Sequence, residues 1–193
     1  MKNYDVLYIG NYTKDTIISP AGTKYVDGGA VNYAAHAAAK LGLKVAVVTR
    51  LSKEDDRVVD RFSRAGIDCY PTYTPQSTLM KLEYPTENPD IRNLSVTGTA
   101  GSVAASEVEY ISARSAVIGS SLRGEVGMDV IDALKDKNMS VAVDMQGFVR
   151  VLRGVELRYE PWDEMLSTLA KVDVVKSDAV EAEFLTGETD IFK

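Results

Sequence analysis

Cysteine and histidine are almost absent from these 193 residues, which contain only Cys69 and His36. One cysteine cannot form a disulfide within the chain, and one of each residue cannot supply a zinc site made of histidine and cysteine. A Ser-His-Asp triad would have to use His36, which lies among alanines in a predicted helix, so we expect it to pack or face solvent. We likewise expect Cys69, near a strand start, to be buried packing and not a nucleophile.

Long hydrophobic runs are also missing, and none approaches the roughly 20 residues needed to cross a bilayer. The start MKNYDVLYIG has none of the charged, apolar and small-residue blocks of a secretory signal. Lys and Arg total 22 against 28 Asp and Glu, and the net charge of −6 gives no overall attraction to nucleic acid or to an anionic membrane. We therefore expect a soluble cytoplasmic protein without membrane or nucleic-acid partners.

The chain does have the composition of an ordinary globular protein, with 45 % hydrophobic and 26 % charged residues. Both fractions are close to average usage and differ from those of disordered or fibrous chains. The length fits one domain, with or without a small appendage, that buries a sizeable core.

Hydrophobic periodicity predicts strands and helices in alternation over most of the chain. Strands are expected at 4–12, 45–49, 115–119, 140–144 and 172–176, and helices at 31–41, 58–65, 126–134, 161–169 and 180–185. Glycines at 42, 66 and 187 supply helix stops. This order predicts an α/β fold with a mostly parallel, Rossmann-like sheet and crossover helices.

The alternation stops between residues 69 and 97, where no helix signal is found. The segments STLMKLEY (77–84) and IRNLSVT (91–97) alternate like strands and are separated by the turn-forming PTENPD. We expect a hairpin of exposed antiparallel strands, a small β lid formed mainly by 69–97. Exposed strand edges invite pairing, so a partner chain or closure over a substrate is expected to cover it.

The common phosphate-loop, dinucleotide, zinc-protease and CxxC motifs do not occur in the sequence. Open parallel sheets place ligands at the carboxyl ends of their strands, and polar residues or glycines gather at those predicted positions. They are Asp15, Gly28, Gly29, Asn32, Asp144, Arg150, Lys176 and Glu181. Taken singly, each of them is better explained as an ordinary cap or an exposed charge, and only the combination indicates a site.

The two glycines in DGGAVNYAAHAAAKLG (27–42) directly precede a helix. Glycine lets the backbone approach a ligand closely, and the free N–H groups of a first helical turn then point at its oxygens. This arrangement suits a polyhydroxylated ligand, although a tight turn packed on the sheet explains it equally well.

The order of motifs resembles the ribokinase family, also called the phosphofructokinase-B family, of sugar and nucleoside kinases. The resemblance spans nearly all 193 residues and is carried by GNYTKD, GGAVN…AAAKLG, RAGID, the β flap, VDMQGFVR and VKSDAVEAEFLTG. It implies a ribokinase-like α/β fold with helices on both faces of the sheet. It also implies a lid that closes over a sugar and pairs two subunits into a homodimer.

For the acceptor, the resemblance implies that four residues line the pocket for the hydroxyls of a small sugar, polyol or nucleoside. They are Asp15, Gly28, Gly29 and Asn32. Asp15 would accept hydrogen bonds from a diol. From Asn32 to Gly42 there are ten steps, one more than the family usually has, so Tyr33 is an alternative for the asparagine position.

For the donor, the resemblance implies ATP with Mg²⁺. Glu181 matches a glutamate that holds water and Mg²⁺ near the phosphates, and Lys176 and Asp178 flank that site. Asp144 and Arg150 match a loop at the ligand end of the sheet, where Arg150 would meet phosphate charge. Asp178 replaces the usual asparagine, and its charge would weaken the ATP contact or favour Mg²⁺.

The family's glycine-rich GAGD-like turn, which supplies the catalytic base and an anion hole, has no match here. GTAGS at 98–102 comes too early and lacks the aspartate. Thr189 and Asp190 could cap a further helix, yet only three residues follow. We therefore expect 1–193 to be a partial ribokinase-like domain, without the C-terminal nucleotide-binding third, with its base beyond Lys193 and inactive alone.

Two other interpretations remain open at this point. The chain could be a non-catalytic module that binds a sugar or nucleoside and has lost the nucleotide half. It could also be an unrelated doubly wound α/β protein, such as a periplasmic-type binding domain, whose glycines are only turns.

Overall fold

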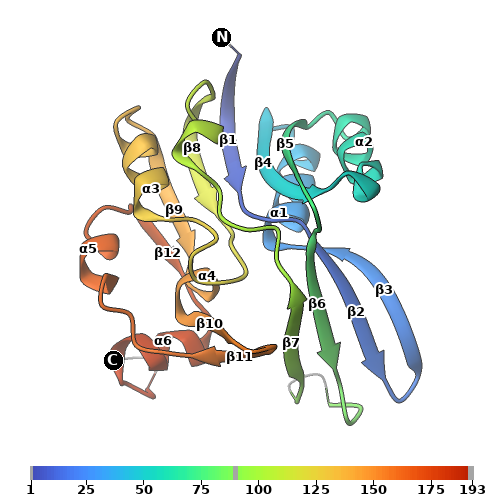
Figure 1. Cartoon of the computed structure of the whole chain (residues 1–193). Coiled ribbons are helices and arrows are strands. Elements are labelled where there is room, and N and C mark those ends of the chain that lie inside the picture. Colours follow the sequence, from blue (N-terminus) through green and yellow to red (C-terminus); the bar gives the residue numbers. More distant parts are fainter. Residues whose placement is uncertain (1, 89–90, 191–193) are drawn as a thin grey trace.

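Two six-stranded sheets make up the protein, whose computed structural model describes residues 2–88 and 91–190 (Figure 1). Sheet A has the strand order β12-β9-β8-β1-β4-β5, and every pairing in it is parallel. Its strands are β12 (Val174–Lys176), β9 (Ser140–Asp144), β8 (Ser112–Ile118), β1 (Asn3–Ile9), β4 (Val45–Ser52) and β5 (Asp68–Thr74). The expected parallel α/β sheet is confirmed.

Helices cover both faces of sheet A, so its central strands are apolar on both sides. Successive residues of β1 enter two separate cores: Val6 packs with helices α1 (Ala30–Lys40) and α2 (Arg57–Arg64), and Leu7 packs with α3 (Met128–Lys135). His36 of α1 stacks on a phenylalanine of α2 with ring centroids 5.2 Å apart, which is a packing role.

The remaining helices are short and lie in the C-terminal part of the chain. They are α4 (Gln146–Val149), α5 (Met165–Leu169) and α6 (Ala179–Thr186), and two 3₁₀ turns occur at η1 (Lys53–Asp55) and η2 (Ala105–Glu107). The glycines expected to stop helices, at 42, 66 and 187, lie within two residues of the ends of α1, α2 and α6. The further helix expected after residue 189 extends into 191–193, outside the described residues.

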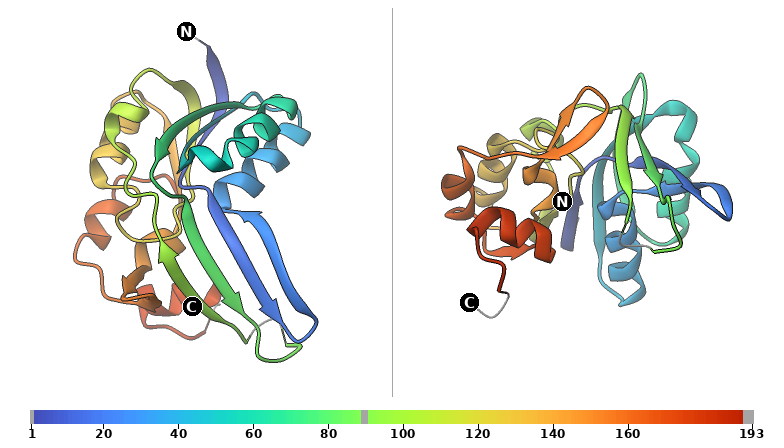
Figure 2. Two further views of the ribbon diagram at one scale, coloured as in Figure 1. Left: turned by 45° about the vertical axis from the view of Figure 1, so that its right-hand side comes forward. Right: turned by 90° about the horizontal axis from the view of Figure 1, so that it is seen from below.

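Sheet B forms the lid, and its strand order is β10-β11-β7-β6-β2-β3. Its strands are β10 (Arg150–Arg153), β11 (Glu156–Tyr159), β7 (Asn93–Gly98), β6 (Thr78–Glu83), β2 (Thr13–Ser19) and β3 (Gly22–Gly28). Strands β2, β3, β6 and β7 project from the end of the molecule at which β1 and β8 finish (Figure 2). The lid therefore stands over the carboxyl edge of sheet A.

The lid differs from the expected hairpin in its extent. Strands β6 and β7 are the expected pair, but β2, β3, β10 and β11 also belong to this sheet. Residues 69–74, expected in the lid, lie in β5 at the edge of sheet A, because β5 pairs in parallel with β4. Asp15, expected just past a strand, lies within β2.

No helix among the described residues is both long and apolar enough to span a membrane.

Candidate functional site

The paired glycines lie where the lid joins the first helix of the main sheet. Gly28 ends β3 and Gly29 is the N-cap of α1. A Cβ on Gly28 would lie 2.0 Å from Oδ2 of Asp15, and Gly29 has φ of 96°, a conformation that side chains disfavour. A larger residue at position 28 would require the Asp15 side chain to move, and one at position 29 would strain the backbone, so Asp15 is in direct contact with the turn.

A hollow of ≈ 210 Å³ opens beside this turn, between the lid and the carboxyl edge of sheet A. The residues that line it are Thr13, Asp15, Gly29, Ala30, Tyr33, Met80, Ser121, Gln146 and Arg150. They come from lid strands β2, β6 and β10, from α1 and α4, and from the loop after β8. Five of them, at positions 13, 80, 121, 146 and 30, were missed by sequence reasoning.

The carboxyl group of Asp15 is the main acceptor in this hollow. Its Oδ1 atom is buried and has no hydrogen-bond partner. Burial raises the pKa of Asp15 above its ordinary value, and the charge of Asp27 raises it further. A buried carboxyl oxygen without a partner is costly unless a ligand or water donates to it. The geometry therefore offers an acceptor for a hydroxyl group.

Asn32 does not line the hollow, although it was expected to. Its side chain is buried and faces α2, donating to the carbonyl of Asp27 (3.0 Å) and accepting from Arg61 (2.9 Å). The neighbouring Tyr33, which is 57 % exposed, lines the hollow instead. Partial burial is the main cause that raises the pKa of Tyr33, and the charge of Asp15 raises it further. Tyr33, the alternative to Asn32 for the family asparagine position, is therefore the residue that lies at the hollow.

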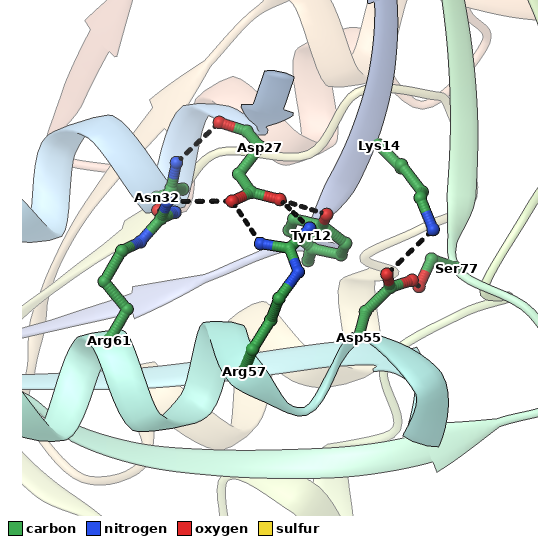
Figure 3. A network of polar contacts seen from close by, with 8 residues as sticks. All are labelled: Tyr12, Lys14, Asp27, Asn32, Asp55, Arg57, Arg61 and Ser77. Atoms are coloured by element: carbon green, nitrogen blue, oxygen red, sulfur yellow. Dashed lines mark hydrogen bonds and ion pairs between the residues drawn. The ribbon is translucent and has the colours of Figure 1, made fainter. Parts of the chain in front are cut away.

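Charged contacts from α2 hold the turn in place (Figure 3). Asp27, just before the glycines, accepts two hydrogen bonds from Arg57 (2.6 and 2.7 Å), one from Arg61 (2.8 Å) and one from the Tyr12 hydroxyl (2.6 Å). The hydrogen bonds from Arg57 are the main reason that the pKa of Asp27 falls to about 2. Its carboxylate is therefore charged at neutral pH, and it joins the lid strand β3 to α2.

A second polar contact joins the lid to the body a short distance away (Figure 3). Lys14 of β2 pairs with the buried carboxylate of Asp55 (2.9 Å), which also accepts a hydrogen bond from Ser77 (2.6 Å). The Ser77 hydroxyl in turn accepts from the backbone N–H of Ser52 (2.9 Å). The root of the lid is thus fixed at two points by charges.

Arg150 is the cation of the hollow. It begins β10, although a loop was expected, and its Nη2 atom is 3.2 Å from Glu181 Oε1. Glu181, only 1 % exposed, also accepts the backbone N–H of Asp178, and Asp178 accepts that of Glu181, which makes a capping box at α6. Arg150 Nε is buried without a partner, so one donor of this guanidinium remains free.

Asp144 and Lys176 end the neighbouring strands β9 and β12, as the sequence predicted, and pair with each other at 3.2 Å. They line an adjoining apolar hollow of ≈ 260 Å³ that shares Ala30 and Tyr33 with the first one. Asp178 lines a third cavity of ≈ 550 Å³, which Arg150 also lines. The candidate donor residues are therefore spread around Arg150.

The family model described as "pfkB family carbohydrate kinase" matches residues 4–192. The chain belongs to the pfkB family of carbohydrate kinases. Among curated protein sequences, none matches it significantly.

Solved structures of ribokinase-family kinases share this fold. A pyrophosphate-dependent kinase of the ribokinase family, in a sulfate complex, is 29 % identical with a TM-score of 0.90, over 97 % of this chain and 66 % of that one. Such a kinase complexed with a pyrophosphate analog and myo-inositol is 28 % identical, with a TM-score of 0.89 and the same shares. Ribokinase from Arabidopsis thaliana, complexed with ribose and ATP, has a TM-score of 0.71 at 15 % identity, over 99 % and 65 %.

The chain thus spans just under two thirds of the length of these relatives. Membership of the pfkB family excludes the interpretation as an unrelated doubly wound α/β protein. The structure brings Asp15, Gly29 and Arg150 to one hollow, with Gly28 against Asp15. It places Asn32 behind that hollow.

Proposed function

We propose that this chain forms the acceptor-binding part of a kinase that transfers a phosphoryl group to a hydroxyl of a small sugar or polyol. The observation that carries the proposal is the unpartnered, buried Oδ1 of Asp15 in a hollow beside the glycine turn. A polyol hydroxyl would donate to this oxygen, while the first turn of α1 and the Ser121 segment would face its other hydroxyls. Gly28 and Gly29 contribute because they lack side chains and so leave room for the Asp15 carboxyl group and for the ligand.

The acceptor class follows from the small, polar hollow and from the relatives. The two relatives at 28 and 29 % identity are more similar to this chain than the plant ribokinase is, and one of them is complexed with myo-inositol. A cyclic polyol is therefore the first acceptor to test, followed by ribose, fructose and a nucleoside.

The donor is a polyphosphate, and Arg150 is the residue best placed to meet its charge. ATP is the donor expected from the family, and pyrophosphate is added because those two relatives depend on it. Lys176, Asp144 and Asp178 would lie near the donor, with Glu181 holding Arg150 in place.

Magnesium would accompany the donor as its counterion. The described residues contain no group of three or more potential ligands that could hold a metal ion. The Glu181 carboxylate accepts hydrogen bonds at both oxygens, which is consistent with contact through water and not with direct ligation.

The attacking hydroxyl also needs a base and an anion hole. These 193 residues include no GAGD-like turn. We therefore expect them to bind the acceptor alone and to transfer phosphate only in a protein that also supplies such a turn.

A homodimer through the lid is part of the proposal. Strand β3 is an outer strand of sheet B, and its Tyr25 is 78 % exposed. Pairing of such edges between two subunits would cover them. The chain has one cysteine, which is free, so its fold needs no disulfide, as expected for the reducing cytoplasm that we propose.

Calorimetric titration of the chain with myo-inositol, ribose, fructose and adenosine tests the acceptor site. We expect one of them to bind, and Asp15→Asn to weaken that binding by about tenfold or more, because a charge-assisted hydrogen bond is lost. Asp60→Asn, an exposed carboxylate on α2, is the control and should bind as the wild type does. Equal binding by the Asp15 variant would contradict the proposal.

A non-catalytic binding module is the second candidate, favoured by the absence of the GAGD-like turn from the sequence. Assays of the complete gene product with ATP or pyrophosphate and Mg²⁺ separate the two. A phosphorylated product supports the kinase, and acceptor binding without any product supports the module.

A further inference from the structure

A buried glutamate without a cation lies behind the hollow, and the proposed reaction does not use it. Glu125, in the loop between β8 and α3, is 3 % exposed and forms no ion pair within residues 2–88 and 91–190. Its Oε2 atom accepts the backbone N–H of Ser121 at 2.6 Å. Its Oε1 atom is buried and has no hydrogen-bond partner. A charged carboxylate in such a place would be costly.

The surroundings of Glu125 are neutral. Burial raises the pKa of Glu125 to about 7, and the groups that act against this shift, the backbone of Ser121 and Leu122 and the side chains of Asn11 and Thr78, are all neutral. The Asn11 Oδ1 atom is likewise buried without a partner. A protonated Glu125 gains an O–H donor, whereas a charged one offers only acceptors.

The charged side chains of the adjacent segments have other partners. Arg50 of β4 donates to the carbonyl of Ala100 and pairs with Glu107 at 2.7 Å. Arg123, two positions before Glu125, donates to the carbonyls of three residues in the 148–161 segment. Neither arginine is available to neutralise the glutamate.

Three neighbours of Glu125, which are Ser121, Thr78 and Asn11, come from three segments that contribute residues to the hollow. Ser121 lines the hollow directly. Thr78 is the first residue of β6, the lid strand that carries Met80 into the hollow. Asn11 precedes β2, which carries Thr13 and Asp15. The Glu125 side chain therefore lies beside both the Ser121 loop and the roots of the lid strands β2 and β6.

We propose that Glu125 is a positioning residue of the acceptor hollow, which holds the Ser121 loop against the roots of β2 and β6 and does so as a neutral carboxylic acid. The proposal rests on the proposed function for its effect on the acceptor. Ionisation of the glutamate would remove its O–H donor and place a charge in a buried site, so the hollow loosens as pH rises.

The first experiment needs no acceptor. Carbon-13 NMR of the side-chain carboxyls, assigned by loss of one signal in Glu125→Gln, should show Glu125 titrating about two units or more above an ordinary glutamate. The Ser121 amide resonance should shift with the same midpoint, and this shift should vanish in Glu125→Gln. A midpoint in the ordinary range, or a Ser121 amide that ignores it, would overturn the proposal.

The second experiment measures acceptor KM against pH on the complete gene product, with myo-inositol and pyrophosphate or ATP as probes. From about pH 6 to about pH 8.5 we expect the wild-type KM to rise about tenfold, whereas Glu125→Gln, a neutral isostere, stays within about twofold. Glu125→Asp, with a shorter side chain, should raise KM throughout. Glu109→Gln, at an exposed position, is the control and should follow the wild type.

The two experiments separate the two proposals. If Glu125→Gln is folded and its KM has the same pH profile as the wild type, the positioning role is wrong. If no acceptor is turned over by the wild type, the proposed function fails, and the carboxyl and Ser121 resonances still decide the role of Glu125.

Discussion

Sheet A and sheet B are held in place by different forces. Strand β4 in sheet A is buried along most of its length, and apolar side chains pack on both of its faces. Strand β3 in sheet B is exposed along its first four residues. Apolar burial stabilises the first sheet, and the second one depends on polar contacts at its root.

The hollow lies between the apolar sheet A and the lid that is held by polar contacts. One wall is fixed by the packed ends of sheet A, and the other is formed by lid strands that are anchored through Asp27 and Lys14. A lid held by a few polar contacts can change its angle without disturbing the core, because little apolar area is at stake. Mutations in the core of sheet A should therefore affect mainly stability, whereas mutations at the root of the lid should also affect ligand binding.

The largest expected effect is a loss of stability from the core of sheet A. Leu7→Ala, at a side chain with 0 % exposure, should lower the free energy of unfolding by about 3 kcal/mol through lost burial and a cavity. Leu82→Ala, at a half-buried position of β6 in the lid, should cost less than about 1 kcal/mol. Urea denaturation of both variants checks the difference.

Similar losses for the two variants would mean that the lid is packed like the core. In that case the distinction drawn between the two sheets would be wrong.

Sequence patterns predicted sheet A well because apolar burial, which stabilises this sheet, leaves a recognisable pattern of hydrophobic residues in the sequence. Continuous apolar runs such as 45–49 and helices with clear stops are what burial on both faces requires. The 77–97 hairpin was also predicted, from alternation and a turn with two prolines. The resemblance to the family then placed Asp15 beside the glycines, as the structure shows.

The rest of the lid was missed for a physical reason. Strands β2 and β3 are partly exposed on both sides, so their sequences show no hydrophobic alternation. Only Pro20 and Gly22 indicate a turn between them. Asn32 contacts Arg61 and does not line the hollow, and spacing in the sequence cannot tell which side of a helix faces a ligand and which faces a neighbouring arginine. Ser121 and Gln146 join the hollow only through folding.

An intermediate effect is expected at the root of the lid. Asp27→Asn removes the charge that Arg57 and Arg61 share, and should cost about 2 kcal/mol of stability because two guanidinium groups lose their partner. It should also weaken acceptor binding severalfold, since the glycine turn is no longer held. Denaturation and calorimetry measure the two effects.

The pH dependence supplies a second measurement for the same residue. Because the pKa of Asp27 is lowered to about 2, its contribution is fully present above the ordinary aspartate value and is lost as pH falls toward 2. The Asn variant should lack this acid-sensitive part. Asp56→Asn, an exposed carboxylate paired with Lys53, is the control and should cost less than about 0.5 kcal/mol. Equal stability of the Asp27 variant and the wild type would contradict a role for this contact.

The smallest stability effect is expected at Lys176, a proposed donor residue whose side chain faces solvent. Lys176 is 62 % exposed and pairs with Asp144 at 3.2 Å, so Lys176→Met should change the free energy of unfolding by less than about 0.5 kcal/mol. If Lys176 lies near the donor as proposed, the same variant raises the KM for ATP or pyrophosphate about tenfold, because one phosphate contact is lost, and leaves the acceptor KM within about twofold. Lys171→Met, at another exposed ion pair, is the control for a change of surface charge. A donor KM equal to that of the wild type would remove Lys176 from the donor site, and a large loss of stability would show that this edge of the sheet depends on charge as the lid does.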